Sequence, residues 1–379
     1  MRGPVHHVYL VPGFFGFTSL GELGYFAHVL DFLRARSREL RVAAEVHVVR
    51  THPTASLPLR AARVLETVAE TAGRSGPVHL IGHSSGGLDA RLLVAPGVML
   101  PCHRDVERLA RRVASVVTVA TPHHGTPLAS FFTSLLGQRL LGVLSLSTVH
   151  VLRFGRLPIS VVARLGAIFA RLDDRVGLNS ALVDQLFRRL LADFSATRRG
   201  TIDTFFAEVS GDQALLAQLA PEGMDVFNAA VRDRPGVRYG SVVARAHPPG
   251  VRSTLAAGLD PSSQASHALY QALYRLASDA GRLRPPSLSR PQARALRRAY
   301  GALPGPSPND GIVPTRSQPW GRIIQAVQAD HLDVVGHFAD RADPPLHADW
   351  LSTGSGFDVE RFDALWHAVS AFVLGAPLD

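Results

Sequence analysis

The first third of the chain alternates short apolar runs with longer segments whose apolar residues recur at helical spacing. Runs rich in valine predict strands, because β-branched side chains pack well on a pleated sheet. The longer segments predict helices. The predicted strands span residues 5–11, 42–49, 78–81 and 113–120, and the predicted helices span residues 22–36, 57–72 and 87–95. This alternation predicts an α/β fold with a mainly parallel central sheet and helices on both faces.

The pattern changes after residue 128. From there to about residue 199, leucine and phenylalanine recur at helical spacing and strands are hard to find. We therefore expect a helical insertion, which could be a cap packed on the core or a mobile lid. Further along, we predict strands at residues 237–245 and 322–328, proline-rich loops at 282–291 and 303–311, and a last helix at 358–374. Because no clean boundary divides the chain, we predict one domain over residues 1–379 that carries the insertion at about 128–199.

Apolar residues make up 46% of the chain and charged residues 19%, which is typical of a globular protein. A single cysteine, Cys102, excludes an internal disulfide. No signal peptide is evident before the apolar run that starts at Val5, so we expect a cytoplasmic protein; a secreted protein is the alternative if the native chain starts elsewhere. The uncharged stretch at residues 140–152 is too short to cross a bilayer, and we do not expect an integral membrane protein.

The formal charge of +9 could suggest a nucleic-acid partner. The chain contains no lysine, however, and its arginines are scattered over the whole length. The densest groups, at residues 34–41 and 104–112, are interrupted by apolar residues at helical spacing, which is typical of solvated helix faces. No nucleic-acid-binding motif accompanies them. We therefore expect no nucleic-acid partner, while a general affinity for anionic surfaces remains open.

Residues 82–86, Gly-His-Ser-Ser-Gly, lie between a predicted strand and a predicted helix and match the nucleophile elbow Gly-x-Ser-x-Gly. In that turn the central serine, Ser84, stands above the sheet edge in a strained backbone conformation. The tight turn leaves no room for side chains at Gly82 and Gly86. Ser85 would contribute its backbone N–H, at the start of the helix, to an oxyanion hole. The same residues also suit an ordinary tight turn.

A nucleophilic serine needs a base within hydrogen-bond reach and an acid that orients the base. In folds with a nucleophile elbow, the acid and then the histidine follow the serine along the chain. Asp310 lies in an Asn-Asp-Gly turn, and His331 comes after the next predicted strand, so with Ser84 they form a candidate triad. An Asp-Gly pair alone is an ordinary turn. His337 and His347 compete for the role of base, and we expect both to be surface or helix histidines.

The second oxyanion donor should come from the turn after the first predicted strand. Pro12 and Gly13 begin a glycine-rich apolar turn there, and the backbone N–H of Phe14 would be the donor. A Pro-Gly pair alone again indicates no more than a turn.

Two histidine pairs could suggest a metal site. His123 and His124 follow the predicted strand at 113–120, but no acidic or cysteine partner stands at ligand spacing. His6 and His7 lie in a predicted strand, where neighbouring side chains point to opposite faces. We therefore expect neither pair to chelate a metal.

Six short motifs together resemble a known family. They are "LVPGFFGF", "VHLIGHSSGG", "ATPHHGTPLASF", "AGLDPSS", "NDGIVPT" and "DHLDVVGHF", and they span the chain from about Val8 to about Phe338. Their order resembles the bacterial true lipases of the Pseudomonas and Burkholderia type, which are serine hydrolases with the α/β-hydrolase fold. The resemblance implies Ser84 as nucleophile, Asp310 as acid and His331 as base. It also implies that the backbone N–H groups of Phe14 and Ser85 form the oxyanion hole.

The resemblance further implies a structural calcium ion beside the loop that holds the catalytic histidine, and no cofactor for the chemistry itself. The ligands would be Asp260 and Asp333, with backbone carbonyls near His337 and Arg341 completing an oxygen-rich shell. The residues alone allow another interpretation, in which Asp260 caps a helix and Asp333 is a surface charge.

The resemblance predicts a carboxylic-ester hydrolase that acts on acylglycerols, with a lipid or small ester as substrate at an oil–water or membrane interface. Alternatives on the same scaffold are a polyester depolymerase, a phospholipase or a thioesterase. A non-catalytic relative that binds a lipid or a protein partner is a further alternative. The sequence departs from the family at Pro12, where such lipases often carry histidine, and in the insertion at 128–199.

Overall fold

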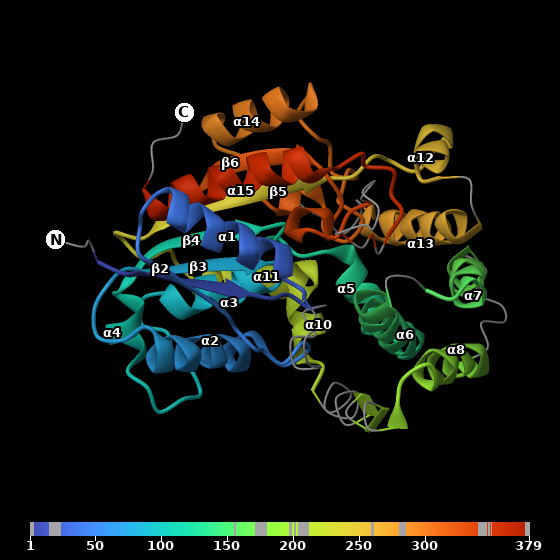
Figure 1. The fold of residues 1–379 in the computed structure, drawn as a ribbon, viewed down its shortest axis with the longest axis horizontal. Helices are drawn as coiled ribbons and strands as arrows, with labels where there is room; N and C mark the ends of the chain where they lie inside the picture. The colour runs from blue at the N-terminus through green and yellow to red at the C-terminus, as the bar shows by residue number, and fades with distance from the viewer. Residues whose placement is uncertain are drawn as a thin grey trace.

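The central sheet has six parallel strands in the order β2-β1-β3-β4-β5-β6 (Figure 1). The computed structural model describes residues 4–14, 24–154, 157–170, 180–196, 199–200, 202–203, 212–258, 261–279, 286–339, 347, 349 and 351–375. The strands are β1 (His6–Val11), β2 (Ala44–Val48), β3 (Val78–His83), β4 (Val113–Val119), β5 (Arg238–Arg245) and β6 (Arg322–Gln328). All six predicted strands are therefore confirmed. Because the strands are parallel, the turns that follow them collect at one edge of the sheet.

Helices cover both faces of this sheet (Figure 1). On one face α1 (Ala27–Glu39) packs against α15 (Val359–Leu374), and these helices also contact β2 and β6. On the other face α3 (Gly86–Val94) lies on β3 and β4, and α2 (Leu57–Thr71) and α4 (Val106–Ala110) pack against α3. Every residue of β3 is buried, as expected for a strand covered on both sides.

The described residues between β4 and β5 are mostly helical, as predicted for residues 128–199. It contains α5 (Pro127–Phe132), α6 (Leu135–Phe154), α7 (Ile159–Ala170), α8 (Ser180–Ala192), α10 (Ala214–Leu219) and α11 (Pro221–Ala230). Helices α5 to α8 extend away from the sheet on the side of the strands' carboxyl ends (Figure 1). After β5 come α12 (Val251–Ala256) and α13 (Pro261–Ala277), and α13 packs on α7.

Helix α14 (Arg290–Tyr300) corrects one boundary of the sequence analysis. It starts inside the predicted loop at 282–291 and packs on β6. Ser289 accepts a hydrogen bond from the N–H of Gln292, and the Gln292 side chain accepts one from the N–H of Ser289. Such a capping box starts a helix, and Pro291 is tolerated because its missing N–H has no helical partner in the first turn. The proline therefore marks a helix start and not a loop.

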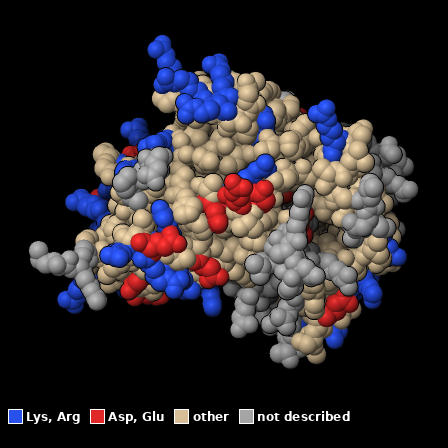
Figure 2. All heavy atoms as spheres, turned by 45° about the horizontal axis from the view of Figure 1, so that its top comes forward, with Lys and Arg blue, Asp and Glu red and all other residues tan. Residues whose placement is uncertain are grey.

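Arginine side chains do not merge into one basic surface on the face that Figure 2 shows, because acidic and neutral residues lie between the groups. The group at the top belongs to α14, whose exposed residues include Arg290, Arg294, Arg297 and Arg298. This distribution suits solvated helix faces.

No helix among the described residues is both long enough and apolar enough to span a bilayer.

A buried ion pair ties the turn after β1 to two helices. The Nη2 atom of Arg60, in α2, lies 2.7 Å from Oδ2 of Asp89, in α3, and both side chains are fully buried. Arg60 also donates hydrogen bonds from Nη1 to the carbonyl of His52 and from Nη2 to the carbonyl of Pro12. Arg60 thus satisfies the buried carboxylate and fixes the chain just before Gly13.

We expect Arg60→Met to lower the free energy of unfolding by about 3–5 kcal/mol, because it leaves the Asp89 carboxylate buried without its cation. Urea denaturation followed by circular dichroism measures this loss. The double variant Arg60→Met/Asp89→Leu, which removes both charges, should recover most of it. A double variant that is no more stable than the single variant would contradict this interpretation.

Candidate active site

Ser84 lies in the turn between β3 and α3 with a backbone φ of +55°. A positive φ costs a residue with a Cβ about 1–2 kcal/mol, and such strain is concentrated at functional sites. The N–H of Ser84 donates a hydrogen bond to the carbonyl of Val119, the last residue of β4. The turn therefore holds the serine in a strained conformation at the edge where the strands end.

Three glycines around Ser84 have no space for a side chain. A Cβ on Gly82 would lie 2.3 Å from the backbone of Gly86, and a Cβ on Gly86 would lie 2.2 Å from the carbonyl oxygen of Val11 in β1. A Cβ on Gly13 would lie 2.4 Å from the Cβ of Ser84. Only glycine allows these backbone segments to approach so closely.

An apolar pocket opens beside Ser84. Its lining residues are Phe14, Ser84, Pro122, Thr126, Leu128, Ala129, Phe132, Leu141, Leu216, Leu219, Ile312 and Val313. The turn after β1 contributes Phe14, the helices after β4 contribute most of the apolar side chains, and the Asp310 loop contributes Ile312 and Val313. An apolar ligand in this pocket would therefore lie next to Ser84.

Phe14 and Ser85 flank Ser84. Phe14 follows Gly13, whose backbone packs against the Ser84 side chain, and Ser85 occupies the N-cap position of α3. N–H groups at the start of a helix attract anions. The Ser85 hydroxyl is buried and makes no hydrogen bond with any described residue.

Asp310 is fully buried and held by four donors. Its Oδ1 accepts hydrogen bonds from the backbone N–H groups of Ile312 (3.0 Å) and Val313 (2.7 Å). Its Oδ2 accepts from Gln318 Nε2 (3.2 Å) and from His331 Nδ1 (2.8 Å). These bonds hold the carboxyl group in one orientation and aim one of its oxygens at the histidine ring.

His331 is oriented by Asp310 at two points. Its Nδ1–H donates to the carboxylate, and its backbone N–H donates to the Asp310 carbonyl at 3.0 Å. In the neutral ring the proton is therefore on Nδ1, and Nε2 carries the lone pair. Nε2 is buried and has no hydrogen-bond partner among the described residues, so it makes no hydrogen bond with Ser84 in this structure. The geometry leaves Nε2 available as a base, and catalytic contacts are often long without substrate.

His83 links the elbow to His331. Its Nε2–H donates to the His331 carbonyl (2.8 Å), and the two rings lie 4.7 Å apart. Its Nδ1 accepts from the hydroxyl of Tyr25 at 2.5 Å. Burial lowers the pKa of His83 far below its usual value, so the ring is neutral and suits this donor and acceptor pair. No sequence pattern marks a role for His83 or Tyr25, although His83 is one of the variable positions of the elbow motif.

Gln318 is a second residue that the sequence analysis missed. Besides Asp310, its amide group bonds both the N–H (2.7 Å) and the carbonyl (3.0 Å) of Ala244 in β5. It therefore connects the Asp310 carboxylate to the sheet. No local motif marks this glutamine, because its partners lie far away in sequence.

His337 and His347 are both buried, so their prediction as surface or helix histidines is wrong. His337 Nε2 bonds the carbonyl of Tyr25, and the His347 ring stacks between those of His28 and Phe338. Both rings pack in the core between α1 and the loop after β6, where long-range contacts outweigh the polar character of histidine.

His123 and His124 follow β4, and His123 is fully buried. Its Nδ1 accepts from Arg91 Nη1 and its Nε2 bonds the Thr118 hydroxyl, both at 3.0 Å. Burial and the Arg91 charge lower the pKa of His123 well below its usual value. This histidine is engaged in the core.

An acidic cluster lies just beyond His331. Asp333 is buried, which contradicts its alternative interpretation as a surface charge. Its Oδ2 accepts from the N–H of Asp330 (2.8 Å) and the hydroxyl of Ser355 (2.7 Å), and it shares a cavity with Asp349. Burial and repulsion from Asp349 raise the pKa of Asp333 to about 7. Of the other three predicted calcium positions, His337 is buried, and Asp260 and Arg341 lie outside the described residues.

No protein-family model matches the chain, and no curated protein sequence matches it. Several solved structures are similar in fold. Lipase 1 from Pelosinus fermentans is 17% identical, with a TM-score of 0.51 over 97% of this chain and 99% of that one. EstA from Clostridium botulinum is 18% identical, with a TM-score of 0.51 over 100% and 90%. The lipase of Staphylococcus hyicus is 15% identical, with a TM-score of 0.50 over 99% and 96%. The chain has the α/β-hydrolase fold, as predicted, while the closer likeness to Pseudomonas and Burkholderia lipases stays a prediction.

Proposed function

We propose that the protein is a serine hydrolase of carboxylic esters. One observation carries the proposal: a strained serine that lines an apolar pocket shares the sheet edge with a buried Asp310–His331 pair. In ordinary turns a residue with positive φ is usually glycine, so Ser84 in this conformation favours a role for its hydroxyl.

In the proposed reaction, His331 Nε2 takes the proton from Ser84 Oγ while Oγ attacks the ester carbonyl carbon. Asp310 stabilises the imidazolium that forms, and the backbone N–H groups of Phe14 and Ser85 donate to the oxyanion. The imidazolium then protonates the leaving alcohol, which leaves an acyl group on Ser84. Water attacks this acyl-enzyme by the same route and releases the acid.

We further propose that the acyl chain lies in the apolar pocket and that the substrates are acylglycerols. Of the described residues, twelve line this pocket and only Ser84 and Thr126 among these carry a polar side chain, which suits a hydrocarbon chain and not a polar acyl group. A polyester depolymerase, a phospholipase or a thioesterase would use the same serine and differ in the leaving group.

The resemblance to lipases also implies a calcium ion, and the acidic cluster fits one. Asp330, Asp333 and Asp349 lie together, and among the described residues none of them forms an ion pair with a basic side chain. Oxygen ligands of this kind suit calcium. We propose that Asp333 and Asp260, with backbone carbonyls near His337 and Arg341, hold a calcium ion that stabilises the His331 loop.

Ser84→Ala should lower kcat/KM for a chromogenic ester by about 10⁴-fold or more, because no other group supplies the nucleophile. Its thermal unfolding midpoint should stay close to that of the wild type. Ser85→Ala should stay within about threefold of wild-type activity, because only the Ser85 backbone has a proposed role. An active Ser84→Ala variant would contradict the assignment of Ser84 as the nucleophile. A wild-type protein that no fluorophosphonate probe labels at Ser84 would favour a non-catalytic binder.

Leu216→Phe should reduce turnover of long-chain esters more than turnover of acetyl esters, because the larger ring fills the acyl pocket. Rates over a series of acyl chain lengths, with and without an emulsified interface, measure this selectivity. The surface variant Leu182→Phe, at an exposed site on α8, serves as the matched control. An equal loss of turnover for esters of every acyl chain length would indicate that the acyl chain binds outside this pocket. A preference for short soluble esters, with no increase in rate at an emulsified interface, would contradict an acylglycerol substrate.

Chelation of calcium should lower the thermal unfolding midpoint of the wild type, and Asp333→Asn should remove this response because it weakens the oxygen shell. Differential scanning calorimetry with EGTA and with added calcium measures the two midpoints. Asp31→Asn, which changes an exposed carboxylate on α1, should respond like the wild type. An identical midpoint with and without calcium in the wild type would rule out the ion.

A further inference from the structure

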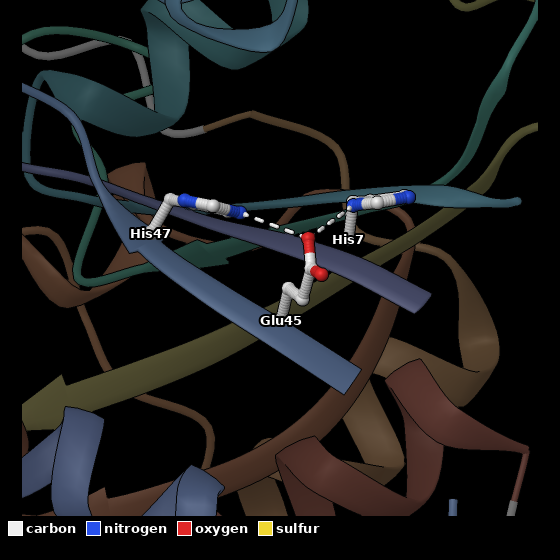
Figure 3. A group of neighbouring side chains, drawn as sticks. All are labelled: His7, Glu45 and His47. Carbon is white, nitrogen blue, oxygen red and sulfur yellow. Dashed lines mark ion pairs between the residues drawn. The ribbon is translucent and has the colours of Figure 1, made fainter. Parts of the chain in front are cut away.

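Three potential metal ligands meet where the first half of β1 pairs with the edge strand β2 (Figure 3). His7 is the register partner of Glu45 in the parallel β1–β2 pair. Glu45 and His47 are two positions apart on β2, so their side chains lie on the same face. The turn of Ser84 lies at the opposite, carboxyl edge, which is a separate site.

The three ligand atoms lie close together. His7 Nδ1 is 3.3 Å and His47 Nε2 is 3.7 Å from the same oxygen, Glu45 Oε2, and all three atoms lie within 4.8 Å of one another. Figure 3 shows both imidazole rings pointing a nitrogen at this oxygen from opposite sides. Two ligands 2.0–2.1 Å from a tetrahedral zinc ion are separated by about 3.3 Å, so small adjustments would bring these atoms to zinc-binding distances.

The surroundings of His7 fix its tautomer. Its Nε2 lies 3.2 Å from the carbonyl of Ser75, and this nitrogen must carry the proton because a carbonyl can only accept. Nδ1 of the neutral ring then presents a lone pair to Glu45. The His7 side chain is only 7% exposed, and Nδ1 finds no hydrogen-bond partner among the described residues. A buried lone pair beside a carboxylate oxygen needs a cation or a proton between them.

The loop that carries Ser75 is itself held in place. The guanidinium of Arg112 donates to the carbonyls of Ala72, Gly73 and Ser75. A backbone carbonyl that accepts from the distal nitrogen of a ligating histidine is a common feature of metal sites, because it orients the ring and raises its basicity.

His47 is also positioned as a ligand. Its ring stacks on Tyr9 with centroids 5.0 Å apart and planes at 17°. Its Nε2 is buried and makes no hydrogen bond within the described part of the chain.

We propose that His7 Nδ1, Glu45 Oε2 and His47 Nε2 bind a zinc ion, with water as the fourth ligand. Two imidazoles and one carboxylate suit zinc better than calcium or magnesium, which prefer shells of oxygen alone. The Glu45 side chain is 55% exposed, so solvent can reach the ion. The zinc joins the edge strand β2 to β1 and stabilises the fold, and this role does not depend on the proposed ester hydrolysis.

Isothermal titration calorimetry of the full chain with Zn²⁺ tests the site. The buffer contains calcium to occupy the acidic cluster of Asp330, Asp333 and Asp349. The wild type should bind one zinc ion more tightly than any further ions. His47→Gln and Glu45→Gln should each weaken this binding by about 100-fold or more, because each removes one of three ligands. Both side chains are partly exposed, so these variants should fold. His103→Gln, which removes an exposed histidine in a loop, is the matched control and should bind like the wild type.

Two further measurements test the same zinc site. Zinc at about 100 times its Kd should raise the unfolding midpoint of the wild type by about 3 °C and leave that of His47→Gln unchanged. Co²⁺ in place of Zn²⁺ should give the visible absorption of a tetrahedral ion in the wild type only. If His47→Gln and Glu45→Gln bind zinc as tightly as the wild type, or if the wild type shows no zinc site, the cluster is an ion pair of protonated His7 with Glu45 and the proposal is wrong.

Discussion

The contact between the turn after β1 and the turn after β3 is the constraint on which the candidate active site depends. Gly13 packs so closely on Ser84 that a Cβ atom on residue 13 would push the two turns apart. The two turns can meet because β1 and β3 are neighbouring parallel strands that end at the same edge. The contact sets Phe14 beside the serine, and the positive φ of Ser84 keeps its side chain at that edge. Neither turn could provide this arrangement alone.

The second half of the site depends on buried hydrogen bonds. A buried polar group without a partner costs about 1–3 kcal/mol, so the four donors around Asp310 fix the carboxylate in one position. His83 then connects the two halves, because it belongs to the elbow and donates to the His331 carbonyl. The imidazole nitrogen that faces away from Asp310 stays without a partner among the described residues. The network thus determines which atom of His331 is free to react.

The sequence predicts the strands well because their valine-rich runs are local signals, and the Gly-x-Ser-x-Gly pattern predicts the turn at Ser84 for the same reason. The Asp310–His331 pair could be predicted from chain order. Gln318, by contrast, acts through contacts between distant segments, and nothing in its neighbourhood marks it. The burial of His337 and His347 was missed for a related reason, because histidine is common on surfaces and only the packed fold shows the aromatic rings around these two.

His6 and His7 show which contacts a local sequence pattern predicts and which it does not. Alternation along one strand correctly indicates that the two rings face opposite sides, since His6 stacks on His79 while His7 turns toward β2. The partners of His7 come from the register between β1 and β2, which local sequence patterns do not fix. β1 therefore joins two sites, because its first residues contact Glu45 and its last residue leads into the turn that packs on Ser84. A change in the pairing of β1 with the edge strand β2 would also move Gly13. Stable pairing near His7 therefore helps to hold Gly13 in its position beside Ser84.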